Sequence, residues 1–108
     1  MMAKIQTIAN LGQFQKLIAE SGARLVVVKF TARWCGPCQV IHPIYEELSS
    51  QHQVVIFCVV DVDAAWDVAE HCEIKAIPTF VFYKNQAEVK RISGANVQML
   101  KQHVESLK

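Results

Sequence analysis

Apolar and polar positions follow two different periods along this chain, and the two periods predict an alternation of strands and helices. Nearly continuous apolar runs are typical of strands that are covered on both faces of a sheet. Two such runs extend from about Arg24 to Phe30 and from Val54 to Val60. Shorter runs predict further strands at Lys4–Ile8, Phe80–Tyr83 and Val89–Ile92.

Four segments instead space their apolar residues at intervals of three and four, which predicts amphipathic helices. They are a segment capped by Asn10 and stopped by Gly22, a segment from Cys38 to about Ser49–His52, Ala64–Cys72, and a segment capped by Asn96. The second helix contains Pro43, which we expect to kink it because proline removes one backbone hydrogen bond.

The resulting order is strand, helix, strand, helix, strand, helix, strand, strand, helix. It predicts an α/β fold in which a central mixed sheet lies between layers of helices. The last two strands are expected to form a hairpin across Lys84–Ala87, a turn without the usual glycine.

Composition limits the organisation and the partners of the chain. Its 108 residues are 52% hydrophobic, enough for one domain, residues 1–108, and too short for two. The formal net charge is only +1 and there is no basic run. We therefore expect the main function to involve neither nucleic acid nor a membrane surface.

The first residues, Met1–Ile8, alternate polar and apolar positions, so we expect no signal peptide, and no later stretch approaches the length of a membrane span. A cytosolic or nuclear location follows as an expectation. In those compartments structural disulfides are rare, so a Cys-X-X-Cys motif favours redox chemistry or metal binding.

Cys35 and Cys38 form such a motif where the apolar strand meets the second helix. The N-terminus of a helix has unpaired N–H groups and a partial positive charge, which stabilise a thiolate. Cys35 is therefore the predicted nucleophile, and the spacing brings Cys38 within disulfide distance. Gly36 lets the backbone turn, and Pro37 supplies a helical φ where no N–H is needed.

The alternative to a redox pair is that Cys35 and Cys38 form half of a zinc site. Zinc needs four ligands, usually as two close pairs, and the two remaining cysteines, Cys58 and Cys72, are isolated in the sequence. We therefore predict a redox pair and no metal. Cys58 is interpreted as a core residue, and Cys72 as inert or as a secondary oxidation site.

Three motifs identify a family resemblance: Trp-Cys-Gly-Pro-Cys at residues 34–38, Ala-Ile-Pro-Thr-Phe at residues 76–80 and Ser-Gly-Ala-Asn at residues 93–96. In order and spacing the chain resembles the single-domain thioredoxins of animals. The resemblance implies the thioredoxin fold, with a mixed five-stranded sheet flanked by four helices. It also implies a protein disulfide reductase that binds no cofactor, is reduced by a separate thioredoxin reductase with electrons from NADPH, and acts on disulfide-containing proteins.

Pro78 has two interpretations. By itself it could be a trans proline at the start of a strand. The resemblance implies a cis bond after Ile77, beside the cysteines, which leaves the Ile77 backbone available to pair with an extended substrate. The resemblance then implies an apolar rim around Cys35. The rim residues are Trp34, Gly36, Pro37, Ile77, Gly94 and Ala95.

Two tryptophans, Trp34 and Trp66, are further candidates for a contact surface near the cysteines. Asp63 matches the family position whose carboxylate supports the indole of Trp34, although an acid that simply ends a strand is the alternative. Trp66 opens the third predicted helix. Its side chain is expected either to pack against the body of the protein or to enlarge a contact patch near the cysteines.

Lys29 departs from the family, which has a buried aspartate at this position. Three interpretations remain open: Lys29 extends its ammonium group to the surface, it stays near Cys38 and favours that thiolate, or it is a neutral base. His42 lies one helical turn after Cys38 and could take over proton transfer, although a solvated histidine is the simpler reading.

The sequence as a whole predicts a monomeric thioredoxin that reduces disulfides through Cys35 and Cys38. The alternative is a thioredoxin-like adaptor that holds a partner on the apolar rim and Trp66, with redox turnover weakened by Lys29.

Overall fold

The computed structural model describes residues 5–108. The predicted first strand begins at Lys4, which lies outside these residues. The strands are β1 (Ile5–Thr7), β2 (Val26–Thr31), β3 (Ile56–Asp61), β4 (Thr79–Lys84) and β5 (Ala87–Ser93). The helices are α1 (Leu11–Glu20), α2 (Gly36–Gln51), α3 (Trp66–His71) and α4 (Val97–Leu107). This order agrees with the predicted one.

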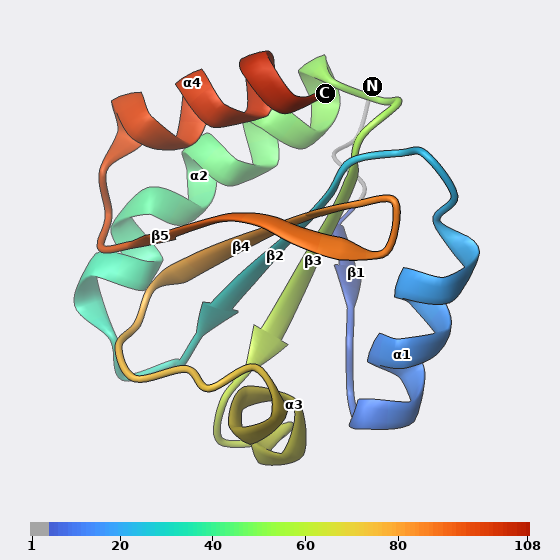
Figure 1. Cartoon of the computed structure of the whole chain (residues 1–108). Coiled ribbons are helices and arrows are strands. Elements are labelled where there is room, and N and C mark those ends of the chain that lie inside the picture. Colours follow the sequence, from blue (N-terminus) through green and yellow to red (C-terminus); the bar gives the residue numbers. More distant parts are fainter. Residues whose placement is uncertain (1–4) are drawn as a thin grey trace.

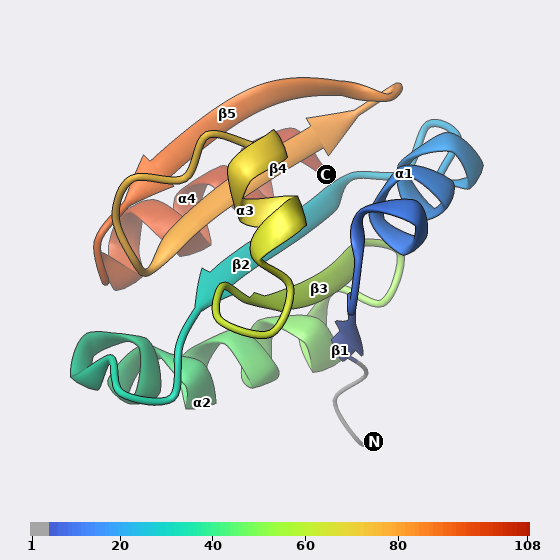
Figure 2. The ribbon, with the colours of Figure 1, turned by 90° about the horizontal axis from the view of Figure 1, so that it is seen from below.

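The five strands form one mixed sheet in the order β1-β3-β2-β4-β5 (Figure 1). β3 pairs in parallel with both β1 and β2, whereas β4 is antiparallel to β2 and to β5. The sheet is therefore mixed, as predicted. Figures 1 and 2 show α1 and α3 on one face and α2 and α4 on the other.

Alternation along β2 divides the core between the two faces. Val26, Val28 and Phe30 belong to the cluster under α1 and α3, whereas Val27 belongs to the cluster under α2 and α4. This follows from the period of two in a strand. The period also directs Lys29 toward α2, and only 1% of its surface is exposed.

Tyr45 connects α2 to the centre of the sheet. Its buried hydroxyl lies 3.0 Å from the carbonyl oxygen of Val27 in β2 and 2.7 Å from that of Cys58 in β3. Desolvation raises the pKa of this phenol. Tyr45 thus fixes the height of α2 over the two strands, and with it the position of the first turn of the helix.

The predicted helix signals act as expected. Asn10 Oδ1 accepts a hydrogen bond from Gln13 N at 2.9 Å, and Asn96 Oδ1 accepts one from Met99 N at 3.0 Å. Gly22, just past α1, has a φ of 61°, which glycine adopts without strain. Pro43 lies inside α2, which continues to Gln51, and the kink expected there stays a prediction.

Some predicted boundaries were wrong. α3 covers only Trp66–His71, two residues shorter at the start and one shorter at the end than predicted. Val54 precedes β3 and is 69% exposed, so it does not belong to a buried strand. Apolar character alone cannot mark the residue at which backbone pairing begins.

Candidate active site

Cys35 and Cys38 lie where β2 passes into α2, and they form a disulfide. Their Cα atoms are 5.3 Å apart. Cys35 is the N-cap of α2, and its Sγ accepts a hydrogen bond from the Cys38 N–H at 3.3 Å. That N–H is one of the unpaired donors at the start of the helix, so a negative charge on Cys35 Sγ is stabilised when the disulfide opens.

The two cysteines differ in exposure. Cys38 is fully buried, whereas Cys35 retains 5% of its surface. Both pack with Ala32, and the side chains of Val62 and Ile77 contact the same cluster. Since Cys38 cannot be reached from solvent, an incoming disulfide can meet only Cys35.

Gly36 and Pro37 form the exposed first turn of α2 between the cysteines. A Cβ added to Gly36 would meet no atom within 4 Å beyond its chain neighbours and its own helix, so the surface beside Cys35 is open. Proline at the second helical position loses no intrahelical hydrogen bond.

Trp34 stands beside the disulfide with 72% of its surface exposed. Its indole Nε1–H donates to Asp63 Oδ2 at 2.9 Å, the contact that the family resemblance implied. Asp63 is itself held by a turn in which its N–H donates to Asp61 Oδ1 at 2.9 Å. The two carboxylates at the end of β3 thus orient an exposed aromatic ring next to Cys35.

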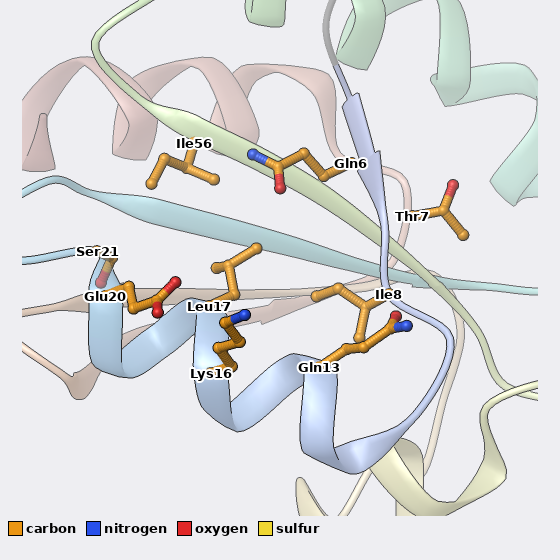
Figure 3. A pocket seen from close by; sticks show the side chains of 9 residues that line it. All are labelled: Gln6, Thr7, Ile8, Gln13, Lys16, Leu17, Glu20, Ser21 and Ile56. Carbon is orange, nitrogen blue, oxygen red and sulfur yellow. The ribbon is translucent and has the colours of Figure 1, made fainter.

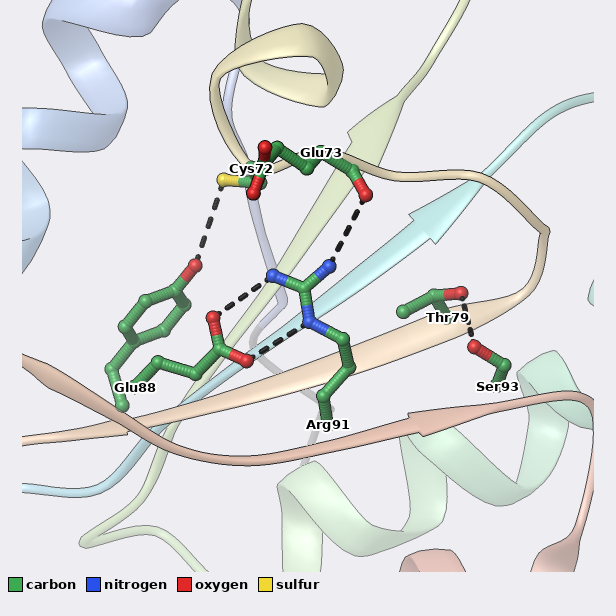
Figure 4. A network of polar contacts seen from close by, with 7 residues as sticks. Cys72, Glu73, Thr79, Glu88, Arg91 and Ser93 are labelled. Carbon is green, nitrogen blue, oxygen red and sulfur yellow. Dashed lines mark hydrogen bonds and ion pairs between the residues drawn. The ribbon is translucent and has the colours of Figure 1, made fainter.

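The Ile77–Pro78 bond is cis, as the resemblance implied. Gly94 N–H donates to the carbonyl oxygen of Pro78 at 2.8 Å, which joins two of the three motifs. Thr79 is the first residue of β4 and Ser93 is the last residue of β5, and their Oγ1 and Oγ atoms are 3.1 Å apart (Figure 4). These contacts bring exposed Gly94 and Ala95 to the same edge of the molecule as Ile77.

A shallow hollow of about 200 Å³ borders this edge. It is lined by Trp34, Val62, Ala69, Ile74, Lys75, Ala76 and Ile77. Trp34 and Ile77 were predicted as rim residues. Val62, Ala69, Ile74 and Lys75 were not, because they come from the turn after β3, from α3 and from the loop that follows α3, and no local pattern in the sequence connects them to Cys35.

Lys29 is buried against α2 and does not reach the surface, so the interpretation of an exposed ammonium group was wrong. Its Nζ lies 2.8 Å from the carbonyl oxygen of Cys38 and 2.9 Å from His42 Nδ1. It is also 5.9 Å from the centre of the Tyr45 ring. Burial lowers the pKa of Lys29 to about 8, partly offset by the negative charge of Glu46.

His42 is half-buried one turn after Cys38. Its pKa is lowered, first by desolvation and then by the positive charge of Lys29, while Glu46 acts in the opposite direction. The sequence suggested a position facing the active site, but the direct contact with Lys29 depends on the packing of α2 against β2.

Cys58 and Cys72 are both buried and free. Desolvation raises the pKa of Cys58 to about 12 and also raises that of Cys72. Cys72 Sγ lies 3.5 Å from the hydroxyl of Tyr83. Close to it, Arg91 forms a bidentate pair with Glu88 and contacts the carbonyl oxygen of Glu73 (Figure 4). Trp66, in contrast, is 64% exposed and does not pack into the core.

A separate hollow of about 360 Å³ lies between β1 and α1 (Figure 3). None of the predicted site residues lines it. Within residues 5–108, no three His, Cys, Asp or Glu side chains gather as a metal-ligand set. No helix in that part of the chain is both long enough and apolar enough to span a membrane.

Comparisons with known proteins agree with this geometry. The family model Thioredoxin matches residues 5–106. The thioredoxin of Ictalurus punctatus is 54% identical over 99 residues, which cover 90% of this chain and 92% of that protein. That of Gallus gallus is 44% identical over 103 residues, covering 95% and 98%. The crystal structure of Fasciola hepatica thioredoxin superposes with a TM-score of 0.94 at 41% identity, covering 96% of this chain and 100% of that one.

Proposed function

The chain belongs to the thioredoxin family and is a protein disulfide oxidoreductase, and from this premise we propose how its residues carry out the exchange. The observation that supports the proposal is the Cys35–Cys38 disulfide at the N-terminus of α2, with Cys35 slightly exposed and Cys38 fully buried. Cys35 is placed to attack a substrate disulfide, and Cys38 is placed to attack Cys35 afterwards.

In the first step the Cys35 thiolate attacks one sulfur of a substrate disulfide. A mixed disulfide with Cys35 forms, and the other substrate sulfur leaves as a thiolate that takes a proton. In the second step the Cys38 thiol loses its proton and attacks Cys35 Sγ. The intramolecular disulfide forms, and the second substrate sulfur leaves reduced. Two electrons pass from the dithiol to the substrate.

We infer that an extended substrate segment binds along the edge formed by Trp34, Ile77 and Gly94. The Ile77 N–H and C=O pair with no other backbone group among residues 5–108, so they are available to a substrate strand. The rim is apolar and shallow, which favours loose selection among disulfide proteins. Gly36, Pro37, Pro78 and Ala95 complete the rim, and Asp63 orients Trp34 through its hydrogen bond.

Regeneration is assigned to a separate partner. We propose that a thioredoxin reductase transfers electrons from NADPH to the disulfide and that the chain binds no cofactor itself. We also propose that residues 1–108 form a single domain that acts as a monomer in the cytosol or nucleus. Exposed Ala76 beside the active site offers no thiol for a linked dimer.

A coupled assay tests this function. NADPH consumption is followed with a thioredoxin reductase and insulin as the disulfide substrate. The wild type and Cys72→Ser should support rapid consumption, because Cys72 lies outside the site. Cys35→Ser should abolish it, and Cys38→Ser should accumulate a mixed disulfide visible by mass spectrometry. Wild-type consumption no faster than that of Cys35→Ser would refute the reductase function and favour the adaptor.

A further inference from the structure

Lys29 is the one buried residue of a charged type among residues 5–108, and its amine contacts the backbone of Cys38. Its Nζ is 2.8 Å from the Cys38 carbonyl oxygen. The carbonyl oxygen and Sγ of a cysteine are separated by only a few covalent bonds. Proton transfer from the Cys38 thiol requires the flexible end of the lysine side chain to turn from this carbonyl oxygen to the Sγ of the same residue.

The surroundings of Lys29 destabilise its charged form, so that a fraction of the amine is neutral at physiological pH. Its two hydrogen-bond partners are a carbonyl oxygen and an imidazole nitrogen, and in the described part of the chain no carboxylate forms an ion pair with it. A buried ammonium ion without an anionic partner is costly. The Lys29 pKa of about 8 agrees with this geometry. An amine that is partly neutral at physiological pH can accept a proton.

His42 provides a path from this buried amine toward solvent. Its Nδ1 lies 2.9 Å from Lys29 Nζ, and its ring is only half-buried. From α2, Cys38, Tyr45 and Glu46 are the other titratable groups near Lys29.

Neither Tyr45 nor Glu46 interrupts the path from Lys29 through His42. The Tyr45 hydroxyl is occupied by two backbone carbonyls, and Glu46 is exposed. The neighbours of Lys29 across the sheet are Val59 in β3 and Phe80 in β4, which do not titrate.

We propose that Lys29 accepts the proton of the Cys38 thiol during the second exchange step and that His42 passes it on to solvent. This rests on the proposed mechanism of disulfide exchange and identifies the proton acceptor within it. Lys29 is a proton-transfer group for Cys38, and His42 is a positioning and exit group that acts through Lys29.

Neutral Lys29 takes H⁺ from Cys38 Sγ and becomes an ammonium ion, while Cys38 becomes a thiolate. The thiolate attacks Cys35 Sγ, the Cys35–substrate bond breaks, and the substrate thiolate takes a proton from water. Lys29 returns its proton to His42 Nδ1, and the imidazolium releases one to solvent. No electrons are exchanged with Lys29 or His42.

The first test measures the titration of Cys38 alone in the Cys35→Ser background, from thiolate absorbance between pH 5 and pH 10. Lys29→Met replaces the amine with an apolar chain of similar length, and Lys29→Leu is a second replacement in case one variant folds poorly. Both should raise the Cys38 titration midpoint by at least about one pH unit. Lys84→Met is the matched control, because Lys84 also donates to a backbone carbonyl, that of Leu107, at 2.7 Å.

The second test follows the reaction of the reduced protein with 5,5′-dithiobis(2-nitrobenzoate) by stopped flow. The first coloured thiolate reports attack by Cys35, and the second reports resolution by Cys38. At pH 7, Lys29→Met should slow the second phase by about 100-fold. His42→Gln keeps a hydrogen-bond acceptor for Lys29 but accepts no proton, so it should slow this phase by about tenfold and leave the Cys38 titration unchanged.

Equal Cys38 titrations in wild type and Lys29→Met would overturn the proposal. So would a raised midpoint with an unchanged second phase, because Lys29 would then act only as a charge. An unchanged second phase in His42→Gln would overturn the exit through histidine. Absence of the first phase in wild type would instead refute the proposed exchange, while the titration would still decide whether Lys29 interacts with the Cys38 thiol.

Discussion

At the scale of a single residue, Lys29 links the stability of the protein to its chemistry. A buried amine with a pKa lowered from 10.5 to about 8 costs the folded state roughly 3 kcal/mol when it is charged. This is a considerable part of the stability of a small domain. The presence of a lysine at the position that we assign to proton transfer is therefore not explained by the stability of the fold.

The cost predicts a distinctive pH dependence. Between the folded pKa of about 8 and the unfolded value of 10.5, the unfolded chain binds more protons at Lys29 than the folded one. Stability from this group should therefore rise as the pH increases through this window and stay lowest below pH 8. Urea denaturation of wild type and Lys29→Met at pH 7 to 10.5 measures this effect as the difference between their free energies of unfolding.

The cysteines and tyrosines are the same in both proteins, so their contributions to the pH dependence cancel in the difference between the two free energies of unfolding. Lys29→Met should be more stable by about 3 kcal/mol at pH 7, and the gap should close toward pH 10.5. A gap that is constant with pH would contradict the lowered pKa.

At the scale of an element, the hairpin β4–β5 shows how backbone geometry and sequence can disagree. Asn85 and Gln86 form its two-residue turn with φ values of 53° and 67°. Two positive φ values are typical of the type I′ turn, whose twist matches that of the strands. Asparagine tolerates this conformation, whereas the Cβ of glutamine is strained in it.

Replacement of Gln86 by glycine should therefore stabilise the protein. Gly adopts positive φ without strain, and we expect a gain of about 1 kcal/mol in the free energy of unfolding. The measurement is the midpoint of urea denaturation. Gln86→Ala is the control: it removes the same polar group but keeps a Cβ, so its midpoint should stay near that of wild type. An equal gain in both variants would show that the backbone strain is not the cause.

At the scale of the whole molecule, the reactive and the inert cysteines lie in different clusters of packed side chains. Cys58 belongs to the core under α1 and α3, and Cys72 joins the same cluster. The active disulfide lies outside both main cores, in a small cluster with Ala32. Because burial raises the pKa of the Cys58 and Cys72 thiols, both remain protonated at neutral pH.

This arrangement predicts the alkylation pattern of the oxidised protein. Native oxidised protein treated with iodoacetamide at pH 8 should gain no label, because Cys35 and Cys38 are in the disulfide and the raised pKa values of Cys58 and Cys72 keep these two thiols protonated. In guanidinium chloride without reductant, Cys58 and Cys72 should both be labelled within minutes. Mass spectrometry counts the labels. Rapid native labelling of Cys72 would show that it is accessible and would revive its role as a secondary oxidation site.

Much of this molecule could be predicted from local patterns. The apolar runs identified the central strands, Asn10 and Asn96 identified helix starts, and the Cys35–Cys38 spacing identified the reactive pair. These signals are local because a strand or helix brings residues at a fixed spacing onto one face, whatever lies elsewhere in the chain. Boundaries such as the start of α3 were less well predicted, because pairing and packing end an element within a residue or two.

Other features were decided only by the tertiary structure. The hydrogen bond between Gly94 and Pro78, the hollow that includes Val62 and Lys75, and the burial of Lys29 against His42 all join segments distant in sequence. The residues alone left Lys29 with three interpretations, since a lysine side chain reaches either solvent or the interior. Its place depends on α2 covering β2 at that point, because only the packed neighbours determine whether the amine is solvated or buried.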